Sequence, residues 1–291
     1  MLITQQDRIL ELPAPDSSGA GTRIVWYATT HNGLVRPENE DAHVVDAQAA
    51  RDTTLRHLLA VADGCGGHRA GATASRTALR TILNEFRYWN GGSPERFISS
   101  ALRRANDEVF GEAHANYEFS NMQTTVTAVV LEHDILAVGH VGDCRLYRLR
   151  KGHTELLTRD HTMASELVHM HMITPEQGLD HPGRHQLTRS LGSEPLLQID
   201  TVKEKIIPGD TYLICSDGLW SQATHNNIED ILQNNAPDKA CKEFVNLALK
   251  GGAPDNVTAI VFNISSVGSQ PPSRSFWRKI LGHHQKDLTS S

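Results

Sequence analysis

The stretch LLAVADGCGGH, from Leu58 to His68, is a run of apolar residues that leads into Asp63 and a glycine-rich loop. Short apolar runs bounded by glycine are typical of buried β-strands. An Asp-Gly pair at such a point is most often a turn, because both residues suit turn conformations. The alternative is a metal ligand whose small neighbours leave room for a substrate. Asp63 by itself does not decide between the two.

Three further aspartates lie at or beside the ends of strand-like apolar runs. ILAVGHVG leads into Asp143, TYLICS leads into Asp217, and Asp255 stands just before VTAIVF. Each one singly is explained by a turn, but strand ends of one sandwich can converge on one edge. Clustered carboxylates repel one another unless they share protons or hold cations. Since their neighbours are small residues and not histidines, the pattern indicates a hard ion, Mg²⁺ or Mn²⁺, and a two-metal hydrolytic centre.

A fifth acidic segment, RPENEDA (36–42), places Arg36 four residues before Glu40 and Asp41, just ahead of another strand-like run. Arginine binds phosphate through two parallel hydrogen bonds. The alternative is a solvated, charged loop.

The pattern along the rest of the chain indicates one continuous domain, residues 22–264. Strands come in runs, and helices come in pairs, at 71–89 with 94–117 and at 226–234 with 237–250. Such grouping favours antiparallel sheets with helices packed outside them over alternating β-α-β units. We expect an N-terminal extension and linker at 1–21, and a linker with a basic, apolar tail at 265–291. That tail could dock a partner or a membrane surface, or pack on its own domain.

The composition excludes several classes of protein. The chain has 291 residues, of which 39% are hydrophobic and 21% charged, as in ordinary globular proteins. Its net charge of -6 argues against nucleic acid as the main partner. The four cysteines form no CxxC pair and fit reduced thiols. With no apolar run of the ~20 residues that a membrane span needs and no signal-peptide pattern, we expect a cytoplasmic protein.

Eight segments, in order over about residues 22–264, resemble the bacterial branch of the metal-dependent protein serine/threonine phosphatases, the type 2C or PPM family. One Asp-Gly pair is uninformative, but eight ordered segments are specific. The segments are RPENEDA (36–42), VADGCGGHRAGATAS (61–75), MQTTVTAVV (122–130), VGDCRLYRLR (141–150), LTRDHT (157–162), HPGRHQLTRSLG (181–192), CSDGLW (215–220) and PDNVTAIV (254–261).

The resemblance implies an α+β fold, a four-layer α-β-β-α sandwich with two central antiparallel sheets. It also implies two Mn²⁺ or Mg²⁺ ions in a cleft at one edge of the sandwich, beside a mobile flap at 162–186. Asp63 would bridge the two ions, and Gly64 would offer its carbonyl to one of them. Asp217 and Asp255 would complete the ligands of the first ion.

The remaining roles follow from the same resemblance. Glu40 and Asp41 would serve the second ion, directly or through water. Asp143 would share a third, weaker ion with Asp217. Arg36 would bind the phosphate. We therefore expect Arg36 and Asp63 to take part in catalysis.

The activity implied is hydrolysis of phosphoserine and phosphothreonine by in-line attack of a metal-bridging water or hydroxide, with no covalent intermediate. Many relatives carry histidine where this chain has Cys65, and metal-bound water and His68 are alternative proton donors. Cys65 is either a redox-sensitive thiol or a tolerated small residue. Other functions left open are a silent phosphoprotein-binding regulator and a phosphatase of small molecules. The partners implied are phosphoproteins and a cognate serine/threonine kinase system in signal transduction, with the chain a monomer.

Overall fold

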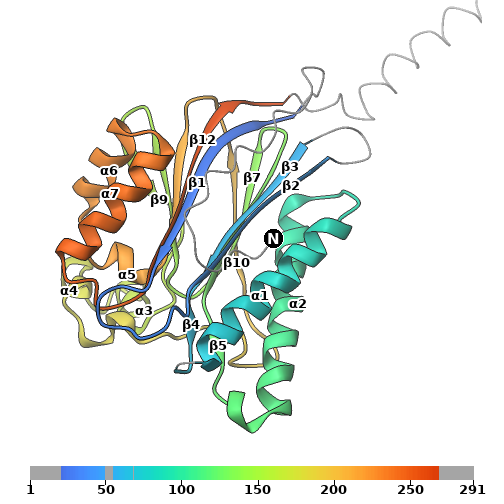
Figure 1. Ribbon diagram of the computed structural model, residues 1–291, viewed down its shortest axis with the longest axis vertical. Coiled ribbons are helices and arrows are strands. Elements are labelled where there is room, and N and C mark those ends of the chain that lie inside the picture. The colour runs from blue at the N-terminus through green and yellow to red at the C-terminus, as the bar shows by residue number, and fades with distance from the viewer. Residues whose placement is uncertain (1–20, 50–54, 68, 269–291) are drawn as a thin grey trace, which may run out of the picture.

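The computed structural model describes residues 21–49, 55–67 and 69–268, which form a four-layer sandwich. Two antiparallel sheets pack face to face in the centre, and a pair of helices covers the outer face of each (Figure 1). The predicted α+β class and the α-β-β-α layering are confirmed.

Ten strands make up the two central sheets in the described part of the chain. In order across the first sheet they are β1 (Arg23–His31), β12 (Val257–Ser266), β11 (Thr211–Cys215), β8 (Arg145–Arg150) and β9 (His153–Leu156). In order across the second sheet they are β10 (Asp200–Lys205), β7 (Ile135–Val141), β6 (Val126–Glu132), β3 (Leu55–Ala62) and β2 (Ala42–Ala49).

The apolar run of β3 is continuous because both of its faces are buried. Leu58 and Ala60 pack in the core beneath helices α1 (Arg69–Tyr88) and α2 (Pro94–Ala115), whereas Leu59 and Val61 pack in the core between the two sheets. Side chains alternate between the faces of a strand, so a central strand covered on both sides has no polar face.

The other outer face is covered by α6 (His225–Asn234) and α7 (Pro237–Lys250), which form a third core with the first sheet. Ser93 caps α2 by accepting a hydrogen bond from the Arg96 backbone N–H at 3.4 Å, and Pro94 follows it at the first helical position. Among the described residues, no helix has the length and apolar character needed to cross a bilayer.

The shorter elements gather at one end of the sandwich, together with the two-stranded sheet of β4 (Gly64–Cys65) and β5 (Gln123–Thr124) (Figure 1). They are the helices α3 (Met163–His169), α4 (Pro175–Leu179) and α5 (Asp217–Trp220) and the 3-10 turns η1 (Tyr117–Phe119) and η2 (Pro182–His185). The predicted flap, 162–186, holds α3, α4 and η2.

The domain limits stay a prediction, although β12 runs to Ser266, two residues past the predicted boundary at 264. Most of the N-terminal extension, 1–20, and the tail residues 269–291 lie outside the described residues.

Candidate metal centre

The four aspartates at strand ends meet at the end of the sandwich where the short elements gather. Asp63 follows β3, Asp143 lies two residues past β7, and Asp217 begins α5 just after β11, while Asp255 lies two residues before β12. They line one cleft with a volume of about 540 Å³. The sequence-based prediction that these carboxylates share one site agrees with this placement.

Strand directions explain the convergence. In the second sheet β3 and β7 each pair antiparallel with β6, so both run the same way and end at the same edge. In the first sheet β11 and β12 are antiparallel, with Cys215 opposite Ala259, so the end of β11 lies beside the start of β12. Residues far apart in the sequence, from Asp63 to Asp255, are thereby placed around one cleft.

Glu40 reaches the same cleft from the loop before β2, and Asn256 fixes that loop. The Asn256 side chain accepts a hydrogen bond from the Glu40 backbone N–H at 2.8 Å and donates to the carbonyls of Asn32 and Glu38 at 2.9 and 3.0 Å. Asn256 is buried and directly follows Asp255, so one short segment supplies a carboxylate and holds another. The PDN triplet was the sequence signal for this role, which our prediction did not include.

Two glycines allow the acidic loop to approach helix α1. Gly64 donates its backbone N–H to the Glu40 carbonyl at 3.2 Å. A Cβ on Gly71 would lie 1.9 Å from Oε2 of Glu40 and 2.8 Å from the Gly64 carbonyl oxygen. Any larger residue at position 71 would therefore displace the Glu40 carboxylate.

Asp41 lies behind the cleft and does not line it. Its Oδ2 accepts hydrogen bonds from Ser216 Oγ at 2.7 Å and from Thr258 Oγ1 at 2.6 Å. The cavity that Asp41 does line is a separate one of about 490 Å³, beside Asn39 and Arg76. The structure thus brings Glu40, but not the side chain of Asp41, to the four aspartates of the cleft.

The cleft concentrates negative charge. Burial raises the pKa of Asp63 well above its usual value, and the carboxylates of Asp41, Asp217, Asp143 and Asp255 raise it further. Burial, then the nearby Asp217, likewise raises the pKa of Asp143. The pKa of Asp41 is raised to about 7, first by burial and against the hydrogen bonds from Thr258 and Ser216.

These residues fit divalent cations. Within the described residues, Oδ1 of Asp41 and Oδ1 of Asp217 are buried without a hydrogen-bond partner. Buried carboxylate oxygens that lack donors and repel one another are stabilised by a cation. The ligand set is oxygen-rich, which Mg²⁺ and Mn²⁺ prefer.

Arg36 lies on the rim of the cleft. Its Nη2 is 2.6 Å from Oδ2 of Asp255, and about half of its side chain is exposed. The guanidinium is therefore held beside a candidate metal ligand while it remains accessible to an anion. The predicted role of Arg36 in binding phosphate stays a prediction.

His185 reaches the cleft from η2, and our sequence-based prediction did not include it. Its Nδ1 lies 3.4 Å from Oδ2 of Asp217, and ligand atoms of His185, Asp217 and Asp143 lie within 4.8 Å of one another. Arg184 donates from Nε to Nε2 of His185 at 3.0 Å. Among 16 histidines scattered through the sequence, no spacing singled out this one.

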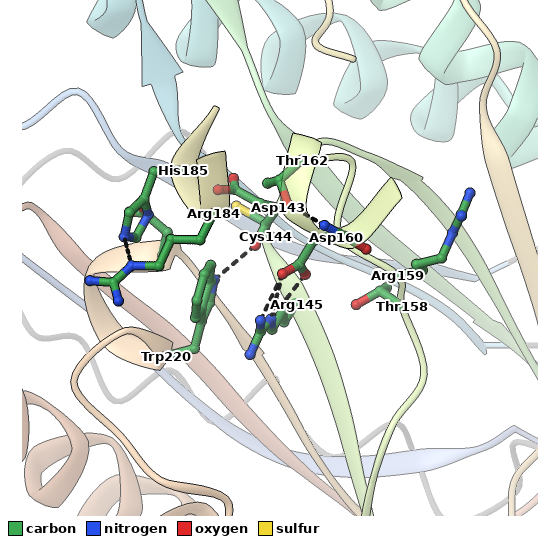
Figure 2. Close-up of polar contacts among 12 residues, drawn as sticks. Asp143, Cys144, Arg145, Thr158, Arg159, Asp160, Thr162, Arg184, His185 and Trp220 are labelled. Atoms are coloured by element: carbon green, nitrogen blue, oxygen red, sulfur yellow. Dashed lines mark hydrogen bonds and ion pairs between the residues drawn. The ribbon is translucent and has the colours of Figure 1, made fainter. Parts of the chain in front are cut away.

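Trp220 connects this part of the flap to the sandwich (Figure 2). The His185 ring stacks on the indole at a centroid distance of 5.9 Å, and the Arg145 guanidinium lies over it at 3.6 Å. The indole N–H donates to the Asp143 carbonyl at 2.8 Å, and Arg145 pairs with Asp160 at 2.7 Å (Figure 2).

Cys65 lines the cleft next to Gly64. Burial raises the pKa of its thiol well above the usual value, and the carboxylate of Asp63 raises it further. His68, the other proton donor considered, lies outside the described residues.

The sequence matches known proteins over most of its length. The model of the protein phosphatase 2C family matches residues 36–250. The serine/threonine protein phosphatase PstP of Mycobacterium tuberculosis is 34% identical over 244 residues, which are 84% of this chain and 46% of PstP. The chain thus spans about half the length of that curated relative. The serine/threonine phosphatase stp of Listeria innocua is 29% identical over 80% of this chain and 92% of its own.

Solved structures of serine/threonine phosphatases are also similar to this chain. The crystal structure of Mycobacterium tuberculosis PstP matches with a TM-score of 0.76 at 33% identity, over 83% of this chain and 99% of that one. The PstP catalytic domain in complex with two manganese ions matches with a TM-score of 0.73 at 32% identity, over 84% and 99% of the two chains. With the family model matching well over half of its residues, this chain belongs to the protein phosphatase 2C family.

Proposed function

We propose that this chain is a Mn²⁺- or Mg²⁺-dependent protein serine/threonine phosphatase. The observation that carries the proposal is the convergence of Asp63, Asp143, Asp217 and Asp255 on one cleft, with Arg36 at its rim. The two manganese ions of the PstP catalytic domain support the choice of metal. Its substrates are phosphoserine and phosphothreonine in proteins.

The ligands of the cations come from separate elements of the fold. Asp63, Asp217 and Asp255 would hold the first ion, and the Gly64 carbonyl would serve one of the two ions. Asp63 also contributes to the second ion, where Glu40 is the other cleft carboxylate. The pair Asp143 and Asp217 offers a third, weaker position, with His185 beside it. Asp41 acts from behind the cleft, through its hydrogen bonds to Ser216 and Thr258.

In the reaction, Arg36 exchanges its contact with Asp255 for two phosphoryl oxygens and so orients the phosphate. When bound, the cations would neutralise phosphoryl charge and lower the pKa of a water molecule, so that it loses a proton and attacks phosphorus at neutral pH. Attack is in line: the water oxygen bonds to phosphorus as the bond from phosphorus to the serine or threonine oxygen breaks, and the proton that the water gives up ends, by way of solvent, on that leaving oxygen. The products are inorganic phosphate and the free hydroxyl.

The same proposal covers the catalytic domain, the cellular location and the partners of the enzyme. Residues 22–266 act as the catalytic domain. All four cysteines are free thiols, as a reducing cytoplasm requires. We propose that the chain works there as a monomer and reverses phosphorylation by a serine/threonine kinase system.

One experiment tests the activity. Phosphate release from a phosphothreonine peptide is measured with Mn²⁺ and with EDTA, for the unchanged chain, Asp217→Asn and Asp230→Asn. Asp230 is exposed on α6 and serves as the matched control. We expect release with Mn²⁺ in the unchanged chain and the control only. Release that survives both EDTA and Asp217→Asn would contradict the mechanism.

A further inference from the structure

A third cavity, of about 330 Å³, lies beneath the flap, next to the catalytic cleft. Its apolar wall comes from four elements: Ala164 and Val168 on α3, Pro175 and Leu179 on α4, Leu156 on β9 and Trp220 on α5. A space of this size accommodates one leucine or aromatic side chain.

Three polar residues around this cavity, Arg145, Thr158 and Asp160, have hydrogen-bond partners within the protein. Nε and Nη2 of Arg145 donate to the two carboxylate oxygens of Asp160 at 2.9 and 2.7 Å, and the same guanidinium stacks on Trp220 (Figure 2). Thr158 accepts from the Leu146 backbone N–H at 3.1 Å. What the cavity offers a ligand is therefore mainly apolar contact.

Arg184 lines both this cavity and the catalytic cleft. It is held between them by hydrogen bonds from Nη1 to the Leu179 carbonyl at 3.1 Å and from Nε to His185 at 3.0 Å. The cavity is thus separated from the cleft by one side chain. An extended peptide advances ~3.3 Å per residue, so two or three residues span ~7–10 Å, about the reach of one arginine.

We propose that this cavity binds an apolar side chain of the phosphoprotein substrate, two or three residues from the phosphorylated one. The inference rests on the proposed function and adds a sequence preference to it. Two apolar residues at the mouth of the cavity remain exposed for the substrate to cover: Leu156 is 39% exposed and Leu179 is 70% exposed. Burying such surface against a leucine favours the peptide that carries it.

The test compares phosphothreonine peptides that differ only in leucine or alanine at one position, two or three residues to either side of the phosphothreonine. For the unchanged chain we expect one leucine peptide to exceed its alanine counterpart by ~10-fold in kcat/KM. In Leu156→Gln/Leu179→Gln the ratio should fall to about one. Met172→Gln is the matched control, because Met172 is 68% exposed on the same flap but does not line the cavity. It should keep the ratio.

The small ester p-nitrophenyl phosphate has no flanking residues, so its turnover should be the same in all these variants. Equal turnover of leucine and alanine peptides by an active enzyme would overturn this inference and leave the proposed function standing. So would a leucine preference that persists in the double variant. If neither ester nor peptide is hydrolysed with Mn²⁺, the proposed function itself fails, and the inference with it.

Discussion

Nη2 of Arg36 lies 2.6 Å from Oδ2 of Asp255, so the candidate phosphate-binding residue is paired with a candidate metal ligand. A cation that takes the Asp255 carboxylate and a phosphate that takes the guanidinium would satisfy both partners better than this half-exposed pair. Exposed ion pairs of this kind contribute little to stability. We therefore expect Arg36 and Asp255 to contribute to binding of the phosphate and the cation more than to the stability of the fold.

Replacing Arg36 should impair catalysis and spare the fold. We predict that Arg36→Ala lowers kcat/KM for a phosphothreonine peptide by ~10²-fold, because a preorganised donor to the phosphoryl group is lost. Arg87→Ala is the control, since Arg87 pairs with Asp46 at 2.9 Å and has a similar exposure away from the cleft. In steady-state kinetics, kcat/KM of the control should lie within about twofold of the value for the unchanged chain. An Arg36→Ala enzyme as active as Arg87→Ala would remove Arg36 from the mechanism.

Manganese should stabilise the folded chain through the carboxylate cluster. A ligand that binds only the folded state at 100 times its Kd adds ~2.7 kcal/mol, so the Tm should rise by several degrees. Asp63→Asn should lose this shift, as measured by thermal unfolding with Mn²⁺ and with EDTA.

In EDTA the same variant should be at least as stable as the unchanged chain, because burial, and then the carboxylates around Asp63, raise its pKa and therefore disfavour its charged form. A full manganese shift in Asp63→Asn would show that the ion binds elsewhere.

Replacing two helical glycines with alanine should have different effects, one on the free energy of unfolding and the other on Mn²⁺ affinity. At Gly111 on α2 nothing lies within 4 Å of the added Cβ, so Gly111→Ala should stabilise the chain by ~0.5–1 kcal/mol. At Gly71 the Cβ would lie 1.9 Å from Oε2 of Glu40, so Gly71→Ala should weaken Mn²⁺ binding at least tenfold. Calorimetric titration with Mn²⁺ and urea unfolding measure the two effects. Equal metal affinity in both variants would show that the contact of Gly71 with Glu40 does not matter.

His161 should make stability fall in mild acid. Its ring is buried 4.7 Å from the His140 ring, and burial, then His140, lowers its pKa to about 3. The unfolded value is ~6.5, so the unfolded state binds the proton first. The contribution of uncharged His161 to the free energy of unfolding is fully present above pH ~6.5 and is lost progressively as the pH falls toward 3.

Between pH 7.5 and 5.5 this one group should reduce the free energy of unfolding by ~1.4 kcal/mol. His161→Asn keeps an acceptor for the Gly142 backbone N–H, which lies 3.0 Å from Nδ1, and removes the titration. Urea unfolding in EDTA at the two pH values should therefore show a shallower loss in the variant. Identical pH dependence in both chains would mean that His161 is charged in the folded state.

The sequence was informative wherever local pattern decides the structure. Continuous apolar runs predicted β3, β7, β11 and β12, because these central strands are covered on both faces. The strand-like segments did not include β10, because DTVKEK lies on an edge strand, alternates half-buried and exposed residues, and is charged at four of its six positions. Its pairing with β7 is a long-range property that no short window contains.

In the candidate site too, residues that a local pattern marks could be predicted from the sequence, and residues placed by long-range contacts could not. Asp63 and Asp217 were predicted from strand ends and from the resemblance to the family. The role of Asn256 was missed because its three hydrogen bonds go to a loop more than 200 residues away. His185 was missed for a similar reason: only the packing of η2 against Trp220 brings it to the cleft. Asp41 was expected to serve the second ion directly or through water; the hydrogen bonds that it accepts from Ser216 and Thr258 hold its side chain behind the cleft, and its role toward the ion stays a prediction.

The most direct test of the binuclear centre counts ions and turnover in one titration. Metal-free enzyme is titrated with Mn²⁺, bound ions are measured by calorimetry, and phosphate release from a phosphothreonine peptide is followed in parallel samples. We predict two tightly bound ions per chain, no turnover in EDTA, and activity that rises as the second ion binds. Full turnover in EDTA, or full activity with no bound Mn²⁺, would contradict the assignment of this cleft as the catalytic metal centre.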